Sequence, residues 1–463
     1  MKKTGFFFVF FIAPVFSIPL ITHRFDREPL IAQIRYAKSL IEKLEYCFSN
    51  NSYCSLEQSI NELIRLLSPR ECRIFNMKQR LIQAELETKA YVAIKCNNIQ
   101  PLISFIVPVY NRQETIRESL DSIVHFNWSI PVEIIVVDDG STDTTHKVLE
   151  EYENKYKNVF VYTHTKNIGA PSARNTAILH ARGTYIFNLD SDDILKPEAV
   201  IYMLEALQKS NLEHAYFDEY NFFWDSDIKN IVLNVKIKHP TAIYTVFDAA
   251  ICQYSVQLPL VIGCRLFSKR AWSRVGGFIE NLGHDNWAFG YMLCAAGMPA
   301  LITSGCGYLH RFWHNQQNMT MQTVRYAWDF SPLRAVREYD ELLNVDMYEK
   351  LPTYVRKNND FFAKVTKQKK IKFLNESNIE CIHAMNNCLW RDDFNDALMC
   401  LDFLLNHNVR HLHIYLSGLK IALYLKKFDL LSELLSQIMD SVSDAVELRL
   451  IDFDDTVHFP YLP

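Results

Sequence analysis

Three short polar sequences hold the residue types best suited to chemistry, and each directly follows a run of apolar residues. They are residues 108–111 (PVYN), 138–141 (DDGS) and 190–193 (DSDD). Two carboxylates one residue apart, as in the last sequence, can hold a divalent cation against phosphate oxygens. Hard oxygen ligands of this kind suit Mg²⁺ or Mn²⁺. A lone acidic pair is common in proteins, so its meaning depends on the elements that position it.

Alternating strands and helices are predicted around these sequences. Strands are predicted at residues 103–109, 132–137, 159–163 and 185–189, and helices at 114–126, 144–156 and 172–181. Continuous apolar runs are typical of strands buried on both faces. Strand–helix alternation at this spacing indicates a parallel sheet with helices on both sides. Ligands of such sheets bind beyond the carboxyl ends of the strands, which is where all three polar sequences lie.

Five longer stretches make the pattern specific: ISFIVPVYNR, EIIVVDDGSTDT, NIGAPSARNTA, ARGTYIFNLDSDD and RLFSKRAWSRVGGF. In their order and spacing they resemble the family 2 glycosyltransferases over residues 103–320, a little under half of the chain. The resemblance implies an α/β domain of the GT-A fold, which binds nucleotide sugars on a mainly parallel central sheet. It also implies transfer of a sugar, with inversion, from a nucleotide-sugar donor (a UDP-sugar is expected) to a hydroxyl group of a glycan, lipid-linked or protein acceptor.

The acidic residues take donor-side roles under this resemblance. Asp190 and Asp192 match metal ligands, with Asp192 the more direct ligand, and the Mn²⁺ or Mg²⁺ ion assists departure of the leaving group. Asp138 matches the position that accepts a hydrogen bond from the nucleotide base, and Asp139 is expected to reach the base or the ribose. An Asp-Gly turn also accounts for both residues. Asp193 is expected to cap the following turn, a structural role.

Further donor-binding positions follow from the same resemblance. Pro108 and Tyr110 match residues that border the base, where an aromatic ring can stack. Ser191 is placed with the donor ligands by its position between Asp190 and Asp192. Arg174 resembles the residue that fixes the donor, either by contacting phosphate or by bracing the acidic cluster.

The acceptor side begins after the Gly-Gly-Phe turn at residues 276–278. Asp285 matches the general base that an inverting transfer requires on the acceptor hydroxyl. The family usually has Glu before this Asp, whereas His284 stands here. Trp287 is expected to form a wall of the acceptor pocket or to pack in the core. His314 is expected to complete the metal site, to contact the diphosphate or to make a structural hydrogen bond, with His310 as the alternative ligand.

Two other classes of function compete with the transferase. A catalytically inactive relative would serve as a binding or scaffold protein, but it has no physical need for Asp138, Asp190, Asp192 and Asp285 together. A nucleotidyltransferase would need a glycine-rich loop with Lys or Arg after the first strand, which residues 108–111 do not provide. A net charge of −4 argues against a nucleic-acid partner.

Helical or apolar segments flank the central domain, which is predicted at residues 99–331. Residues 1–22 have the basic start and apolar run of a signal or a membrane anchor, although a buried helix is also compatible. This predicts membrane association or a place in the secretory pathway, with the cytoplasmic face also possible. Residues 23–98 are predicted to be a helical stalk or cap.

The C-terminal region, residues 332–463, is predicted to be helical. Its segment 378–442 has the pattern of two antiparallel helix pairs, which resembles a tetratricopeptide hairpin or a plain helical extension. A protein partner is expected for these helices if they form a binding surface.

Overall fold

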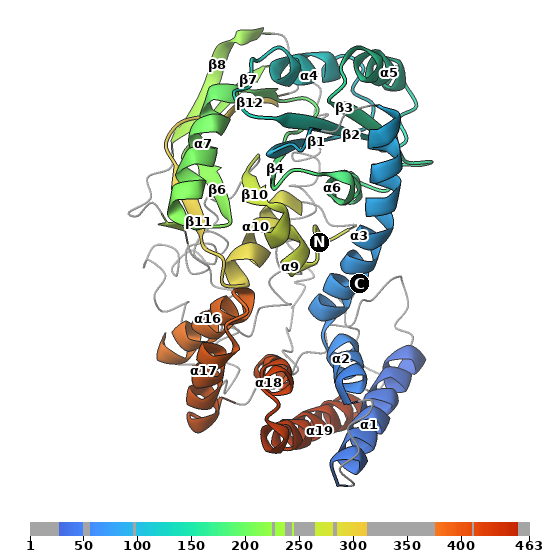
Figure 1. The fold of residues 1–463 in the computed structure, drawn as a ribbon, viewed down its shortest axis with the longest axis vertical. Coiled ribbons are helices and arrows are strands. Elements are labelled where there is room, and N and C mark those ends of the chain that lie inside the picture. The colour runs from blue at the N-terminus through green and yellow to red at the C-terminus, as the bar shows by residue number, and fades with distance from the viewer. Residues whose placement is uncertain are drawn as a thin grey trace, which may run out of the picture. The chain divides into compact units, whose positions relative to one another are not determined.

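The computed structural model describes residues 27–49, 56–95, 99–224, 227–236, 243–244, 264–280, 285–312, 376–409 and 412–451 (Figure 1). The described residues form two compact units. One contains the residues up to Arg73 together with the C-terminal helices, and the other begins at Ile74 and contains the sheets. The predicted segment 23–98 is thus divided within its third helix, α3 (Pro69–Ile94).

An eight-stranded sheet forms the centre of the second unit, in the order β3-β2-β1-β4-β10-β6-β11-β9. Its strands are β1 (Ile103–Val109), β2 (Val132–Asp138), β3 (Val159–Thr163), β4 (Tyr185–Asn188), β6 (His214–Phe217), β9 (Ile243–Tyr244), β10 (Leu266–Ser268) and β11 (Ala300–Thr303). The first four strands, β1 to β4, pair in parallel as predicted, whereas β10 runs antiparallel to both β4 and β6. The α/β class is therefore confirmed, with a mixed sheet.

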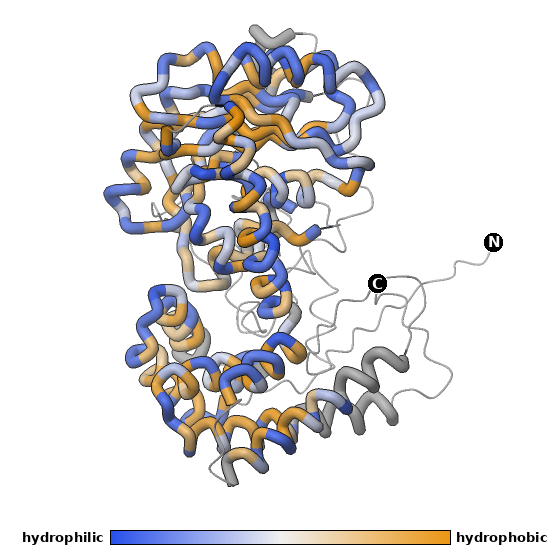
Figure 2. Tube along the Cα trace, turned by 45° about the vertical axis from the view of Figure 1, so that its right-hand side comes forward, coloured by the Kyte–Doolittle hydropathy of each residue, from blue (hydrophilic) through white to orange (hydrophobic). Residues whose placement is uncertain are grey.

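Helices cover both faces of this sheet (Figure 1). Those on one face are α4 (Ile116–Val124), α5 (Thr145–Lys155) and α7 (Pro197–Ser210), and those on the other are α6 (Ala170–His180), α9 (Lys269–Val275) and α10 (Asp285–Ala295). All seven residues of β1 are buried, because side chains alternate between the faces of a strand and each face meets a helix. Phe105 and Val107, for example, share one apolar cluster with Leu120 of α4 and Leu149 of α5. Figure 2 shows this hydrophobic centre in orange.

The strand register brings the polar strand ends to one edge. Val109 pairs with Asp138 across β1 and β2, and Ile106 pairs with Asn188 across β1 and β4. The backbone amide of Asp139 donates to the carbonyl of Val109 at 2.8 Å. The acidic sequence that begins at Asp190 therefore starts beside the ends of β1 and β2, as the sequence predicted.

A second sheet, in the order β5-β12-β7-β8, was not predicted. It consists of β5 (Ile194–Leu195), β7 (Glu219–Trp224), β8 (Asp227–Lys236) and β12 (Tyr308–Phe312). Tyr308 of β12 pairs with Leu195, antiparallel to β5. Since β5 directly follows the acidic sequence, this pairing places β12 beside it.

The first unit is helical, as expected at both ends of the chain. It contains α1 (Arg27–Ser49), α2 (Leu56–Leu67), α16 (Glu376–Trp390), α17 (Phe394–Asn406), α18 (Leu412–Tyr424) and α19 (Phe428–Ile451). Apolar residues from α1, α2, α18 and α19 share a core, exemplified by Ile41, Ile60, Leu419 and Leu434. The predicted pairs are present, α16 with α17 and α18 with α19. No helix in the described part of the chain is long and apolar enough to cross a membrane; residues 1–22 lie outside that part.

Candidate active site

Arg174 lies at the centre of the polar strand ends. It belongs to α6, which begins after Gly169 at a φ of 97°, and it is 4% exposed. Its Nη2 atom donates to Asp190 Oδ1 at 2.5 Å, and its Nη1 atom donates to Asp285. Burial lowers the pKa of this guanidinium, but the charges of Asp285 and Asp190 outweigh burial, so its net pKa is raised. Arg174 thus stays charged and joins the two carboxylates.

Asp285 is the first residue of α10 and is 9% exposed. Asp285 and Asp190 bind the same guanidinium, that of Arg174. The sequence assigned Asp190 to the donor side. The predicted general base and a predicted metal ligand therefore lie in one site, although 95 residues separate them in the chain. Asp285 lies 111 residues after Arg174 and Asp190 lies 16 residues after it, which gives this separation of 95 residues.

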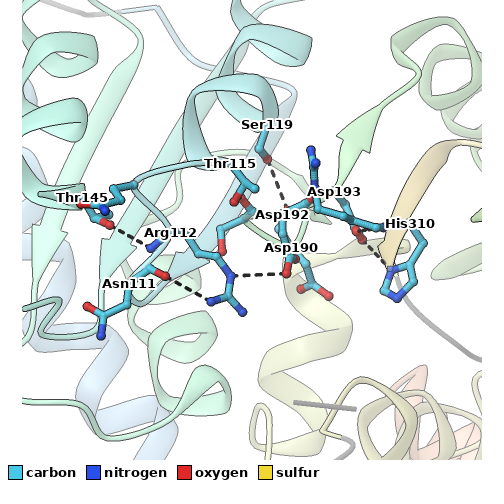
Figure 3. A network of polar contacts seen from close by, with 12 residues as sticks. Asn111, Arg112, Thr115, Ser119, Thr145, Asp190, Asp192, Asp193 and His310 are labelled. Atoms are coloured by element: carbon cyan, nitrogen blue, oxygen red, sulfur yellow. Dashed lines mark hydrogen bonds and ion pairs between the residues drawn. The ribbon is translucent and has the colours of Figure 1, made fainter. Parts of the chain in front are cut away.

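Arg112 approaches the acidic sequence from the end of β1 (Figure 3). Its Nε atom lies 3.3 Å from Asp192 Oδ2. The backbone amide of Arg112 donates to Thr145 Oγ1 at 2.9 Å, and the preceding Asn111 has a φ of 51°. This turn directs the arginine toward the site. Arg112 is the last residue of the stretch ISFIVPVYNR, but no role was predicted for it; its position directly after PVYN was the available signal.

Asp193 is held by the second sheet. Its Oδ1 atom accepts from the backbone amide of Arg311 at 3.1 Å, and its Oδ2 atom lies 3.1 Å from His310 Nδ1 (Figure 3). Asp193 was expected to cap the following turn. Instead, Lys196 occupies the N-cap position of α7, without a side-chain capping bond. The role of Asp193 is structural, as expected, but its partners are on β12.

The charges of this pair are set by burial and by each other. Burial raises the pKa of Asp193 to about 6, while His310 acts to lower it. Burial lowers the pKa of His310, but the neighbouring Asp193 more than offsets this and raises it to about 9. His310 is therefore a cation at neutral pH and pairs with Asp193, which is a poor state for a metal ligand.

Arg311 ties the acidic sequence to α4. It is 4% exposed; its Nε atom donates to the carbonyl of Asp192 at 2.9 Å, and its Nη2 atom donates to Glu118. No local pattern in the sequence indicated this role, because the partners of Arg311 lie 119 and 193 residues earlier in the chain.

The two aspartates at the end of β2, Asp138 and Asp139, have different partners. Asp139 is 2% exposed. Its Oδ1 atom accepts from Ile168 N at 3.0 Å and its Oδ2 atom from Gly169 N at 2.8 Å, so it holds the loop before α6. His164 Nδ1 also lies 2.7 Å from Asp139 Oδ1. The side chain of Asp138 accepts from Ser141 N at 2.9 Å, as expected for the Asp-Gly turn.

The remaining predicted residues are placed as follows. Pro108 is buried within β1 and Tyr110, just after this strand, is 39% exposed. Ser191 is buried, and its carbonyl accepts from Thr115 Oγ1 at 3.3 Å. Trp287 lies on α10, but its side chain is outside the described residues, as are His284 and His314.

A divalent cation fits this site only with help from a ligand. Among the described residues, no group of three or more His, Cys, Asp or Glu side chains could hold a metal ion. Asp190 and Asp192 instead offer two partly exposed carboxylates, 28% and 17% exposed. Mg²⁺ is commonly held in this way, by one or two carboxylates with phosphate oxygens and water.

Comparison with known proteins decides the family. Residues 104–272 match the sequence model described as Glycosyl transferase family 2. These residues form a family 2 glycosyltransferase domain. They include Arg112, Asp138, Arg174 and the whole acidic sequence, whereas Asp285 follows the matched part of the family 2 domain.

Curated relatives match parts of this chain. A poly(ribitol-phosphate) beta-glucosyltransferase of Bacillus spizizenii is 48% identical over 103 residues, which are 21% of this chain and 16% of the relative. Chondroitin synthase of Escherichia coli is 30% identical over 227 residues, which are 48% of this chain and 29% of the relative. The chain thus spans less than a third of the length of either protein.

Solved structures are less similar to this chain. The structure of S. aureus TarS 1–349 in complex with UDP-GlcNAc has a TM-score of 0.41 and 18% identity, covering 73% of this chain and 91% of that chain. This likeness is too low to carry an argument about the family 2 domain.

Proposed function

We propose that this protein transfers one sugar from a nucleotide-sugar donor to an acceptor hydroxyl group with inversion. UDP-sugars are the first donors to test. The observation that supports this proposal best is the guanidinium of Arg174, which binds Asp190 of the acidic sequence and Asp285 of α10. A carboxylate suited to the leaving group and one suited to the attacking hydroxyl are thereby held in one site. The family 2 match and the names of both curated relatives support the same reaction type.

The donor occupies the edge formed by β1, β2 and β4 in this proposal. Asp138 accepts a hydrogen bond from the base, and Tyr110 provides an exposed ring beside it. Asp190 and Asp192 face the diphosphate and would hold Mn²⁺ or Mg²⁺, which would neutralise charge on the departing phosphate. Arg112 supplies a second cation near Asp192, at a place where a guanidinium can bind phosphate oxygens.

Asp285 receives the proton of the acceptor hydroxyl as the oxygen attacks the anomeric carbon. Inversion requires this base and the leaving group to lie on opposite faces of the sugar. Arg174 orients the carboxylate of Asp285 by hydrogen bonding. We place His284 and Trp287 on the acceptor side because they flank Asp285 in sequence.

Two measurements test the proposal. The full chain is incubated with a panel of nucleotide sugars and divalent cations, and donor consumption is followed with and without glycan acceptors. We expect one donor to be consumed, and Asp285→Asn to lower kcat by at least a hundredfold, since general base catalysis contributes on the order of 10²–10⁴-fold. The anomeric configuration of the product is then determined by NMR. Retention of configuration, or full activity of Asp285→Asn, contradicts the mechanism.

A further inference from the structure

A buried amide stands at the end of β4, where apolar side chains surround it. Asn188 is 0% exposed, as are the neighbouring Phe187 and Leu189. Burying an amide without hydrogen bonds is unfavourable, because the amide loses its bonds to water. An apolar side chain could fill this place without that cost. The hydrogen bonds of Asn188 therefore indicate why an amide stands here.

Both ends of the Asn188 amide are used, and they face different elements. Its Oδ1 atom accepts from the backbone amide of Arg265 at 3.0 Å, just before β10. Its Nδ2 atom donates to Asn286 Oδ1 at 2.9 Å, in the first turn of α10. A backbone N–H can only donate, so the bond to Arg265 fixes the orientation of the amide and directs Nδ2 toward Asn286.

Arg265 holds the same turn from a second direction. It is 0% exposed. Its Nη1 atom donates to Tyr216 Oη at 2.8 Å, and its Nη2 atom donates to the carbonyl of Asn286. The guanidinium carbon also lies 4.8 Å from the centre of the Tyr216 ring. Because the guanidinium is planar and rigid, holding it against Tyr216 also fixes where it meets Asn286.

Asn286 is therefore held through its side chain by Asn188 and through its backbone by Arg265, and it directly follows Asp285. We propose that Asn188 and Arg265 are positioning residues, which fix the first turn of α10 so that the Asp285 carboxylate stays on Arg174. Asn188 is also two residues before Asp190. The donor-side acidic sequence and the proposed base thus share one rigid support in addition to Arg174.

This inference rests on the proposed function, because it assigns a purpose to the placement of Asp285. A purely structural role for the network predicts something different. In that case, its loss would lower the melting temperature, while kcat of the folded protein would stay the same. Misplacement of a catalytic group by about 1 Å can cost on the order of 10²-fold in rate, so kcat separates the two roles.

The test uses the full chain with its working donor and acceptor. Asn286→Ala removes only the side-chain bond to Asn188 from a half-buried position, and Asn188→Leu replaces the amide by an apolar side chain of similar size. Arg265→Lys keeps the positive charge but loses the planar guanidinium, which donates to Tyr216 and Asn286 at the same time. Asn158→Ala is the matched control, because Asn158 Nδ2 donates to the Val132 carbonyl at 3.4 Å at the opposite edge of the sheet. For each protein, kcat, the donor KM and the melting temperature are measured.

We expect Asn286→Ala to lower kcat on the order of tenfold or more with the donor KM within about twofold of wild type. The double variant Asn188→Leu with Asn286→Ala should lose no more kcat than the worse single variant, because the bond between Asn188 and Asn286 is already absent from each single variant. Asn158→Ala should keep wild-type kcat. Full kcat in Asn286→Ala, or additive losses in the double variant, overturns the positioning role. If instead Asp285→Asn is fully active, the proposed function itself fails. The activity of Asp285→Asn is measured separately, so this failure is distinguished from a failure of the positioning role alone.

Discussion

Arg174 of α6 and Asp285 of α10 form a buried ion pair although 111 residues separate them. The same guanidinium binds Asp190 at 2.5 Å. Burial of one cation between two carboxylates stabilises the site only while all three charges are present. Removing one member leaves an uncompensated charge in a poorly hydrated place. Arg174 therefore supports both the fold and the proposed chemistry.

Arg174→Gln tests this dual role. We expect the free energy of unfolding to fall by about 3–5 kcal/mol, the usual cost of breaking a buried ion pair, and transfer activity to be lost. Both are measured, the first by urea unfolding and the second by donor consumption. The matched control is Arg117→Gln, because Arg117 pairs with Glu151 at 2.7 Å on the surface, with both side chains at least half exposed. The control should lose no more than about 1 kcal/mol. Equal effects of the two variants would contradict the buried pair.

Removal of divalent metal is the second prediction. With Asp190 and Asp192 as ligands, chelation should lower transfer on the order of a hundredfold or more, because a Lewis acid contributes several kcal/mol. Asp192→Asn should weaken Mn²⁺ binding measured by electron paramagnetic resonance in the presence of a nucleoside diphosphate. Asp402→Asn, on the exposed side of α17, should leave Mn²⁺ binding unchanged. Full transfer activity in the presence of a chelator would remove the metal from the mechanism.

Local patterns predicted the first half of the catalytic domain well. Continuous apolar runs gave β1 and β2 with ends displaced by no more than one residue, since buried parallel strands have a strong signal. The acidic sequence was placed correctly at a strand end for the same reason. These elements lie close together in the chain, so alternation predicts that their strands are parallel, although it does not predict that β4 pairs with β1.

Other parts of the site depend on contacts between distant segments. The antiparallel β10 is three residues long and has no distinctive pattern, so the mixed sheet was not predicted. His310 appeared in the sequence as a possible metal ligand, yet pairing of β12 with β5 turns it toward Asp193. Asn188 lies within the stretch ARGTYIFNLDSDD, but its contact with Asn286 of α10 forms only in the folded chain. Such roles arise from tertiary packing, which periodicity does not encode.

Asp138 and Asp139 should respond differently to substitution. Asp139→Ala removes the acceptor of the Ile168 and Gly169 backbone amides, so we expect a loss of about 2–4 kcal/mol in unfolding free energy. Asp138→Ala removes one such bond and should cost about 1 kcal/mol. It should also raise the donor KM by about tenfold, since a hydrogen bond to the base is lost. Thermal unfolding and steady-state kinetics separate the two. A raised KM in Asp139→Ala without loss of stability would reverse the assignment.

His214 gives the stability of the sheet domain a predictable dependence on pH. It is fully buried, its Nε2 atom lies 2.8 Å from the Met298 carbonyl, and burial lowers its pKa to about 3. Below about pH 6.5, the unfolded chain protonates this histidine while the folded protein does not, so stability falls as pH falls, by about 1.4 kcal/mol per unit. His214→Gln retains a donor for Met298 but cannot titrate. Urea unfolding between pH 7 and pH 5 should therefore show a smaller slope for this variant than for wild type. Parallel curves for wild type and His214→Gln would show that His214 does not titrate on unfolding.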